Sequence, residues 1–200
     1  TVAILGNAGG TAARALGRFY PDAWVDGVEL DPAVSDVGFD YFGMGDNPRL
    51  RVHDADARPF LRRTTERYDL IVVDAYRQPY VPFYLATREF FRLARERLAP
   101  GGILALNVAS VPGDSRLLDG IAGTLTHEFG SVAVWPALRF NKILLAFDEP
   151  AAVQIRRQDV AAPLRPLVDL LLRQLRPVTG KAERPWTDDR APVEWVTDRM

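Results

Sequence analysis

The sequence predicts an α/β protein with a Rossmann-like, doubly wound, mostly parallel sheet of seven strands and an antiparallel hairpin at one edge. Short apolar runs, typical of strands buried on both faces of a parallel sheet, alternate with helical patterns. A loop of small residues, Gly6–Gly10, separates the first strand from the first helix. Two apolar runs joined by a short connection then break the alternation, and they predict the hairpin over 132–147.

The alternation starts at the first residue. TVAILG (1–6) is nearly all apolar, which predicts a buried strand, and TAARALGRF (11–19) has the spacing of a helix. AWVDGVELD (23–31) predicts a second strand that ends in acids. AVSDVGFDYFG (33–43) predicts the next helix.

The later elements continue the same pattern as far as the hairpin. In order, we expect strand RLRVHDADA (49–57), short helix ARPFLRRT (57–64), strand YDLIVVDAY (68–76), amphipathic helix TREFFRLARERL (87–98), strand GILALNV (102–108) after a turn at Pro100-Gly101-Gly102, helix RLLDGIAGTLTHEF (116–129), hairpin strands SVAVWPAL (131–138) and NKILLAFD (141–148), and helix PLRPLVDLLLRQL (163–175). The last twenty residues are polar with scattered prolines.

Composition excludes several classes of function. The formal net charge of −1 offers no bulk attraction to nucleic acid or to acidic membranes, and no apolar run reaches transmembrane length. The chain has no cysteine and only two histidines, so we expect no metal site. No signal peptide is visible, so we expect a cytoplasmic location without membrane contact. Because the chain starts inside a strand without an initiator Met, we expect it to be a piece of a longer protein.

Acidic side chains stand where the predicted parallel strands end. In a doubly wound sheet, ligands bind at the carboxyl ends of the strands. Past the glycine loop, those ends carry Glu29, then Asp54 and Asp56, then Asp74. Each could also be a solvated or capping acid, but their recurrence at three strand ends indicates a ligand site.

The loop and the acids together favour an adenosyl sulfonium over a dinucleotide. GNAGGT does not match G-x-G-x-x-G, and a sulfonium nucleoside has no pyrophosphate to bind at the helix start. Glu29, nineteen residues after Gly10, is spaced to hold both ribose hydroxyls. Asp56 is placed to accept the exocyclic amine of adenine, with the N–H of Ala57 donating to the ring.

The segments ILGNAGG, VELDPAV, DADARPFLRR, YDLIVVDAY and TREFFRLARERLAPGGILALNV occur in an order that resembles the spermidine synthase family. These aminopropyltransferases of polyamine biosynthesis are built on the class I methyltransferase fold. The resemblance runs from residue 1 to about residue 147. The ending WTDDRAPVEW is similar to the tail of a subgroup of spermidine synthase-like proteins, some of them fused to membrane-transporter segments.

The resemblance implies a co-substrate, an acceptor and roles for single residues. The co-substrate would be decarboxylated S-adenosylmethionine, or S-adenosylmethionine in a methyltransferase. The acceptor would be a small amine or another small molecule. The resemblance is also compatible with a homodimer. The implied nucleoside-binding residues are Gly6, Asn7, Gly9, Glu29, Leu30, Asp56 and Ala57. Asp74 would be the general base on the attacking amine, and Tyr76, Arg77 and Gln78 would contact the acceptor. We expect residues 1–150 to form the nucleoside-binding domain, with a C-terminal helix and tail, 151–200, packed on it.

The chain departs from the family pattern at three places. Ala8 and Arg77 stand where the family carries acids that hold amines, and the family's N-terminal β-rich segment is absent. We therefore expect weak or no aminopropyl transfer to putrescine. One alternative is a methyltransferase in which Arg77 pairs with a substrate carboxylate while Tyr76 or Tyr80 covers an apolar portion. The other is a non-catalytic nucleoside-binding domain of a larger protein.

Overall fold

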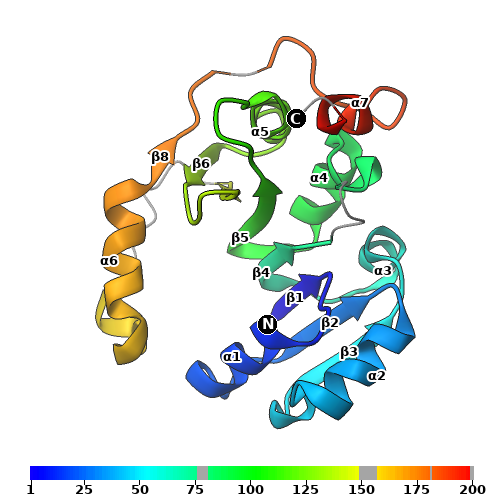
Figure 1. The fold of residues 1–200 in the computed structure, drawn as a ribbon, viewed down its shortest axis with the longest axis vertical. Coiled ribbons are helices and arrows are strands. Elements are labelled where there is room, and N and C mark those ends of the chain that lie inside the picture. Colours follow the sequence, from blue (N-terminus) through cyan, green and yellow to red (C-terminus); the bar gives the residue numbers. More distant parts are fainter. Residues whose placement is uncertain (76–80, 149–156, 181, 199–200) are drawn as a thin grey trace.

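The computed structural model describes residues 1–75, 81–148, 157–180 and 182–198. In this part of the chain, eight strands form a sheet in the spatial order β3-β2-β1-β4-β5-β7-β6-β8 (Figure 1). The strands are β1 (Val2–Leu5), β2 (Val25–Glu29), β3 (Leu50–Asp54), β4 (Tyr68–Val73), β5 (Leu98–Ala109), β6 (Ser131–Trp135), β7 (Asn141–Phe147) and β8 (Arg176–Pro177).

The strand pairing confirms the predicted fold class. Strands β3, β2, β1, β4 and β5 pair in parallel, and β7 pairs antiparallel with both β5 and β6. The sheet has one strand more than the predicted seven, because β8 adds antiparallel to the outer side of β6. A two-residue strand that contains a proline carries no apolar periodicity, so its sequence could not predict it.

The predicted turn before the fifth strand is wrong. Strand β5 begins at Leu98, which pairs with Tyr68, and runs on through Pro100-Gly101-Gly102. The pairing is irregular here, since Leu70 of β4 already pairs with Ile103. Gly101 has a φ of +76°, a conformation that glycine adopts without strain. The three residues therefore form an irregularity within the strand.

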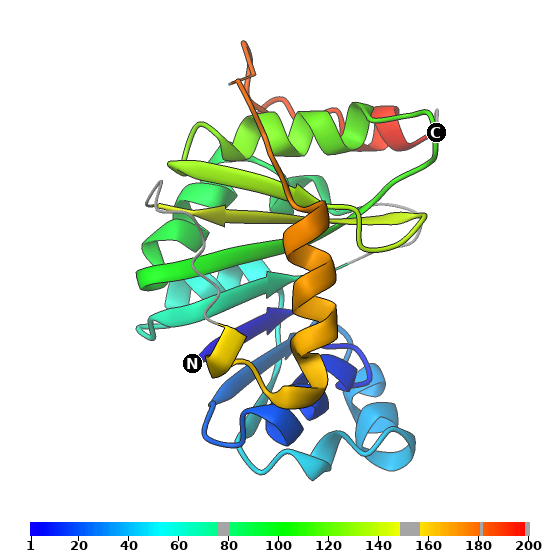
Figure 2. The same ribbon diagram turned by 90° about the vertical axis from the view of Figure 1, so that its left-hand side faces the viewer.

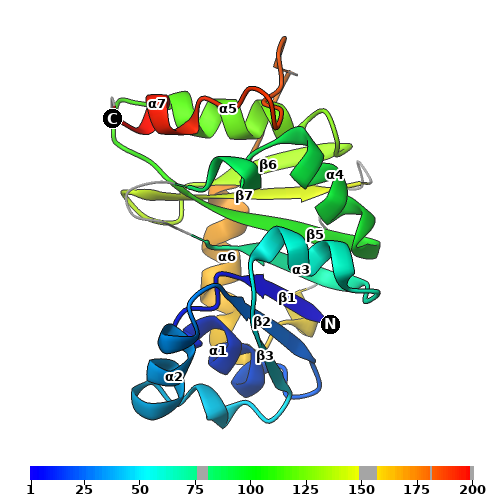
Figure 3. The same ribbon diagram turned by 90° about the vertical axis from the view of Figure 1, so that its right-hand side faces the viewer.

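The helices cover the two faces of the sheet. They are α1 (Thr11–Phe19), α2 (Pro32–Tyr41), α3 (Ala57–Arg63), α4 (Arg88–Glu96), α5 (Arg116–Leu125), α6 (Arg165–Gln174) and α7 (Val193–Thr197), with short 3-10 helices η1 (Met44–Asp46), η2 (Phe83–Leu85), η3 (Arg157–Asp159) and η4 (Ala162–Leu164). Helix α6 crosses one face (Figure 2), and α3 and α4 pack on the opposite face (Figure 3). Among the described residues, none of the helices has both the length and the apolar character needed to cross a membrane.

Strand β1 is apolar throughout because it contributes to a core on each face. All of its residues are buried, as expected for a strand in the middle of a parallel sheet. Ala3 and Leu5 belong to the larger core, under α3, α4 and α5, whereas Val2 and Ile4 pack against Ala13 of α1. The side chains alternate between the faces, as the twofold repeat of a strand requires.

A buried carboxylate lies beside this core. Asp26 of β2 is 2% exposed and is hydrogen-bonded to Arg51 (2.7 and 2.8 Å), His53 (2.8 Å) and Tyr68 (3.0 Å). Its neighbour on β1 is the small Ala3. Burial acts to raise the pKa of Asp26, but the hydrogen bonds from His53, Arg51 and Tyr68 outweigh burial and lower it. We call Asp26, Arg51, His53 and Tyr68 the Asp26 cluster.

The C-terminal tail contains regular structure that its polar sequence did not predict. Helix α7 inserts Val193 and Val196 into the larger core, where both are buried. Only two of its side chains are apolar and buried, so the segment has no extended periodic pattern. Packing on the core, rather than propensity, accounts for this short helix.

Candidate functional site

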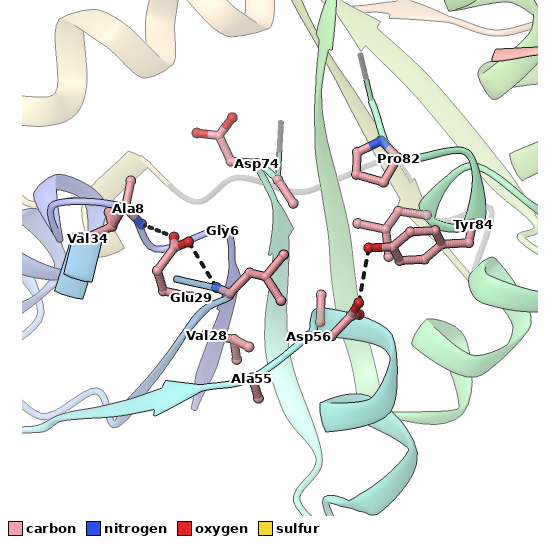
Figure 4. Close-up of a pocket in the computed structure, with 14 residues that line it drawn as sticks. Gly6, Ala8, Val28, Glu29, Val34, Ala55, Asp56, Asp74, Pro82 and Tyr84 are labelled. Atoms are coloured by element: carbon pink, nitrogen blue, oxygen red, sulfur yellow. Dashed lines mark hydrogen bonds between the residues drawn. The ribbon is translucent and has the colours of Figure 1, made fainter. Parts of the chain in front are cut away.

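A cavity of about 340 Å³ lies at the carboxyl ends of β1, β2, β3 and β4, the edge at which the sequence predicts a ligand. Figure 4 shows the carboxylates of Glu29, Asp56 and Asp74 around this space. The residues that line it are Gly6, Ala8, Val28, Glu29, Leu30, Val34, Ala55, Asp56, Ala57, Asp74, Ala75, Pro82, Tyr84 and Leu85.

The loop after β1 requires glycine at its first position. Gly6 has a φ of +92°, and a Cβ there would lie 2.5 Å from the carbonyl oxygen of Asp74 and 2.7 Å from Cα of Ala75. Because of this close approach, the loop lies directly beside the end of β4. Ala8 has a φ of +45°, which is uncommon for a residue with a side chain. The loop thus brings backbone, and at Ala8 only a methyl group, to the cavity.

Glu29 is held by the backbone around it. Its Oε2 accepts the N–H of Ala8 at 2.9 Å, and its Oε1 accepts those of Leu30 at 2.9 Å and Asp31 at 3.2 Å. A carboxylate oxygen has two lone pairs, so these contacts leave one acceptor position, on Oε2. Glu29 therefore has room for one further donor in this arrangement, whereas the predicted grip on both ribose hydroxyls needs two.

Asp56 faces the cavity and also starts α3. As the N-cap, it accepts the N–H of Arg58 on Oδ1 at 3.0 Å, and its Oδ2 accepts the hydroxyl of Tyr84 at 3.0 Å. The N–H of Ala57, the first residue of α3, is among those that a helix leaves without an intrahelical partner. This pair therefore offers a ligand an acceptor next to a backbone donor.

Asp74 stands immediately after β4 and is exposed. The side-chain amide of Asn107 on β5 donates to Oδ1 of Asp74 at 2.8 Å, and the side-chain amide of Asn141 on β7 donates to Oδ1 of Asn107 at 3.0 Å. This chain of amides orients one oxygen of Asp74. The carboxylate is thus held by Asn107, which Asn141 of the adjacent strand holds in turn, in a position to accept a hydrogen bond or a proton.

The structure brings most of the predicted site residues to one cavity. Gly6, Glu29, Leu30, Asp56, Ala57 and Asp74 line it. Tyr76, Arg77, Gln78 and Tyr80 lie outside the described residues.

Asn7, Gly9 and Asp54 are not among the lining residues. Asn7 is 4% exposed and points beneath the loop, where its amide group lies 3.0 Å from the sulfur of Met44. A Cβ on Gly9 would face Phe42. Asp54 accepts the hydroxyl of Ser35 of α2 at 3.0 Å.

Two contributors to the site were missed in the sequence. Tyr84, in η2, lines the cavity and binds Asp56. The segment AYRQPYVPFY (75–84) was expected to form a pocket, but of its tyrosines only Tyr76 and Tyr80 were named, because no periodic pattern singles out Tyr84. Asn107 orients Asp74 from within the apolar strand GILALNV, where a polar residue near the strand end was a usable signal. In the described part of the chain, no group of three or more His, Cys, Asp or Glu side chains is arranged to hold a metal ion.

Known proteins resemble this chain in sequence and in fold. The spermine/spermidine synthase domain matches residues 1–129. A polyamine aminopropyltransferase from Vibrio vulnificus is 32% identical over 174 residues, which cover 82% of this chain and 57% of the Vibrio protein. The chain therefore spans little more than half the length of that relative.

Two solved structures extend the likeness to three dimensions. A probable spermidine synthase from Corynebacterium glutamicum matches with a TM-score of 0.71 and 23% identity, over 99% of this chain and 68% of the other. Human methyltransferase-like protein 13, in complex with SAH, matches with a TM-score of 0.67 and 25% identity, over 91% and 84%. Both likenesses agree with a methyltransferase-type fold. Because the domain match covers more than half of its residues, this chain belongs to the spermine/spermidine synthase family.

Proposed function

We propose that this chain carries the nucleoside site and the catalytic base of an aminopropyltransferase that uses decarboxylated S-adenosylmethionine. The observation that carries the proposal is the ring of three carboxylates, Glu29, Asp56 and Asp74, from the ends of three parallel strands around one cavity. A co-substrate with a sulfonium and an ammonium group is attracted to such a ring, whereas a pyrophosphate is repelled. Membership of the family supports the same choice.

The cavity can be assigned to the nucleoside by its donors and acceptors. In this assignment, the free position on Oε2 of Glu29 accepts a ribose hydroxyl, and Leu30 packs beside the sugar. Asp56 accepts the exocyclic amine of adenine, and the N–H of Ala57 donates to the ring. SAH in the related human structure is a ligand of the same chemical type. The apolar lining from Pro82 and Leu85 suits the faces of the base.

In the reaction, Asp74 acts on the attacking amine. An alkylammonium has a pKa of about 10.4, the value for lysine, and must lose a proton before it can attack. Asp74 hydrogen-bonds the ammonium, takes its proton and directs the nitrogen lone pair to the methylene carbon beside sulfur. The new N–C bond forms as the C–S bond breaks, and methylthioadenosine leaves with the electron pair on sulfur. Positioning supplies much of the rate, because the sulfonium is already a good leaving group.

The proposal includes a division of the chain. Residues 1–150 form the nucleoside-binding domain, and residues 151–200 pack on it. The burial of Val193 and Val196 of α7 in the core that also contains Ala3 and Leu5 of β1 supports this division. The acceptor is a small amine. The remaining length of the relatives leaves room for further acceptor contacts outside this chain.

A methyltransferase is the second candidate. It is favoured by the match to human methyltransferase-like protein 13, which extends over 84% of that chain, a larger share than the 57% for the Vibrio protein. Ala8, at a position where the family carries an acid, also removes one charge that would hold an aminopropyl group. In that case the co-substrate is S-adenosylmethionine and the transferred group is methyl.

Calorimetry with methylthioadenosine, S-adenosylhomocysteine and putrescine separates the candidates. An aminopropyltransferase is expected to bind methylthioadenosine more tightly, and a methyltransferase S-adenosylhomocysteine. Binding of methylthioadenosine with neither putrescine binding nor turnover would indicate a non-catalytic domain. If neither nucleoside binds, the proposal is wrong.

The Glu29→Gln variant tests the placement of the ribose. The amide loses the charge and turns an NH₂ group toward backbone N–H donors, so methylthioadenosine binding should weaken by about 1.5–3 kcal/mol, the range for hydrogen bonds to charged groups. Glu183→Gln, the same change at an exposed position of the tail, is the control. Unchanged binding in Glu29→Gln would put the ribose elsewhere.

A further inference from the structure

An ion pair joins the C-terminal tail to Arg58, which follows the cavity residues Asp56 and Ala57 in α3. Nη1 and Nη2 of Arg58 donate to Oδ1 and Oδ2 of Asp188 at 2.8 and 2.6 Å, across 130 positions of sequence. The Arg58 side chain is 11% exposed and that of Asp188 40%. Arg58 Nε is buried without a hydrogen-bond partner among the described residues, so the two Nη groups carry its polar contacts. Such two-point pairs fix both direction and distance.

Arg58 connects this ion pair to the residues that line the cavity. Its Nη1 also donates to the backbone carbonyl of Tyr84 at 3.2 Å, and the hydroxyl of Tyr84 donates to Asp56 at 3.0 Å. Asp56 in turn accepts the backbone N–H of Arg58. The start of α3 is thus hydrogen-bonded to the η2 segment through both the backbone carbonyl and the hydroxyl of Tyr84.

Residues at the start of α4 hold Asp188 of the tail in place. The hydroxyl of Thr87 donates to Asp188 Oδ1 at 2.7 Å, and the N–H of Asp188 donates to Glu89 at 3.0 Å. Next to it, the backbone carbonyl of Trp186 accepts the N–H of Arg88 at 2.8 Å, and the backbone N–H of Trp186 donates to the hydroxyl of Thr124 at 3.0 Å. The hydrogen bond from Arg58, with a smaller contribution from Thr87, lowers the pKa of Asp188, so its carboxyl is ionised at neutral pH.

We propose that Asp188 is a positioning residue for nucleoside binding, which acts through Arg58 to fix Tyr84 against Asp56. The inference rests on the proposed function for the identity of the ligand. Asp188 itself is not among the residues that line the cavity. When Asp188 loses its charge, the guanidinium of Arg58 is no longer directed at the Tyr84 carbonyl. The carboxylate of Asp56 then loses Tyr84 as a fixed neighbour.

The first test compares Asp188→Asn with Asp189→Asn, in which the adjacent exposed acid of the same tail is changed. Calorimetry with methylthioadenosine should give a Kd about 2- to 30-fold higher for Asp188→Asn, the range for residues that act on a ligand through a network, and an unchanged Kd for Asp189→Asn. Asp188→Glu keeps the charge and should recover most of the affinity. Equal Kd values for wild type and Asp188→Asn overturn the inference.

A double-mutant cycle distinguishes positioning from a general loss of stability. If Asp188 acts through Tyr84, Tyr84→Phe should raise the Kd less in the Asp188→Asn background than in the wild type. If the effects of the two substitutions on the binding free energy are additive, the inference is wrong, because additivity means that the two residues act independently.

Hydrogen exchange provides a readout that needs no ligand. The N–H groups of Leu85 and Ala86 donate to Pro82 and Phe83 at 2.9 Å within the η2 segment. Their exchange should be faster in Asp188→Asn than in Asp189→Asn or the wild type. If the wild type binds no methylthioadenosine, the proposed function fails. Hydrogen exchange then decides whether Asp188 holds the η2 segment in place. Unchanged exchange in Asp188→Asn would overturn the positioning role too.

Discussion

Replacing Gly6 by Ala is expected to destabilise the protein by about 2–5 kcal/mol. Two effects combine. A residue with a side chain costs about 1–2 kcal/mol in the left-handed region, where Gly6 lies with a φ of +92°. The new Cβ would also lie 2.5–2.7 Å from backbone atoms of Asp74 and Ala75, well inside van der Waals contact. Overpacking of this kind costs a further ~1–3 kcal/mol.

The chain offers a control that separates these effects. Gly113 has a φ of +88°, and a Cβ there would meet nothing within 4 Å. Gly113→Ala therefore carries the backbone cost alone, about 1–2 kcal/mol. The difference between the two variants measures how closely the loop approaches the end of β4.

Urea denaturation followed by circular dichroism gives both free energies of unfolding. We expect Gly6→Ala to be less stable than Gly113→Ala by about 1–3 kcal/mol, which corresponds to a Tm lower by roughly 2–12 °C for a chain of this size. Because the clash displaces the segment that carries Asp74, turnover should also fall in Gly6→Ala alone. Equal destabilisation by the two substitutions would refute the close approach.

Three further predictions concern charged groups. Asp74→Asn should keep methylthioadenosine affinity while turnover falls by roughly 10²–10⁴, the range for a general base; equal turnover would make Asp74 a structural acid. Asp26→Asn should lower the free energy of unfolding by about 1.5–3 kcal/mol at neutral pH. Since the pKa of Asp26 is lowered on folding from 3.8, its contribution is full above that pH and is lost as the pH falls through the folded value, so the difference between variant and wild type should shrink below about pH 4 in acid titrations. Ala8→Asp should improve putrescine binding in calorimetry by about tenfold, which corresponds to half of the nearly 3 kcal/mol given by Coulomb's law for one unit of charge at ~6 Å and an effective dielectric of ~20. Arg77→Asp should improve it by more, because it removes a positive charge and adds a negative one. Efficient spermidine formation by the unaltered chain would show that the acids are dispensable.

The elements with strong local patterns were predictable, and those set by distant contacts were not. The predicted bounds of α1, 11–19, agree with the structure because Gly10 in the left-handed region ends the loop just before it. The buried strands followed from their apolar runs. Strand β8 is a short segment fixed by its pairing with β6, and helix α7 is a short segment fixed by its packing on the core. Neither contact can be predicted from the residues of the segment itself.

The same distinction applies to the site. The edge of the sheet and its acids could be placed from strand order alone. The burial of Asn7 could not, because the space for its side chain comes from Gly27 on β2, where a Cβ would lie 2.7 Å from the Asn7 side chain. The capping role of Asp56 did have a signal in the Asp-Ala-Arg-Pro segment, since Asp is a preferred N-cap and Pro suits the first turn.

Each carboxylate at the cavity is already hydrogen-bonded by the protein itself. Backbone N–H groups hold Glu29, Arg58 and Tyr84 hold Asp56, and Asn107 holds Asp74. The acceptors are therefore preorganised, and a ligand need not supply the roughly 0.5–1.5 kcal/mol of ordering that a free side chain would require. The same bonds occupy lone pairs, so a donor can approach only along the directions that remain. Selectivity at this edge of the sheet then depends on where a ligand's hydrogen atoms point as much as on its charge.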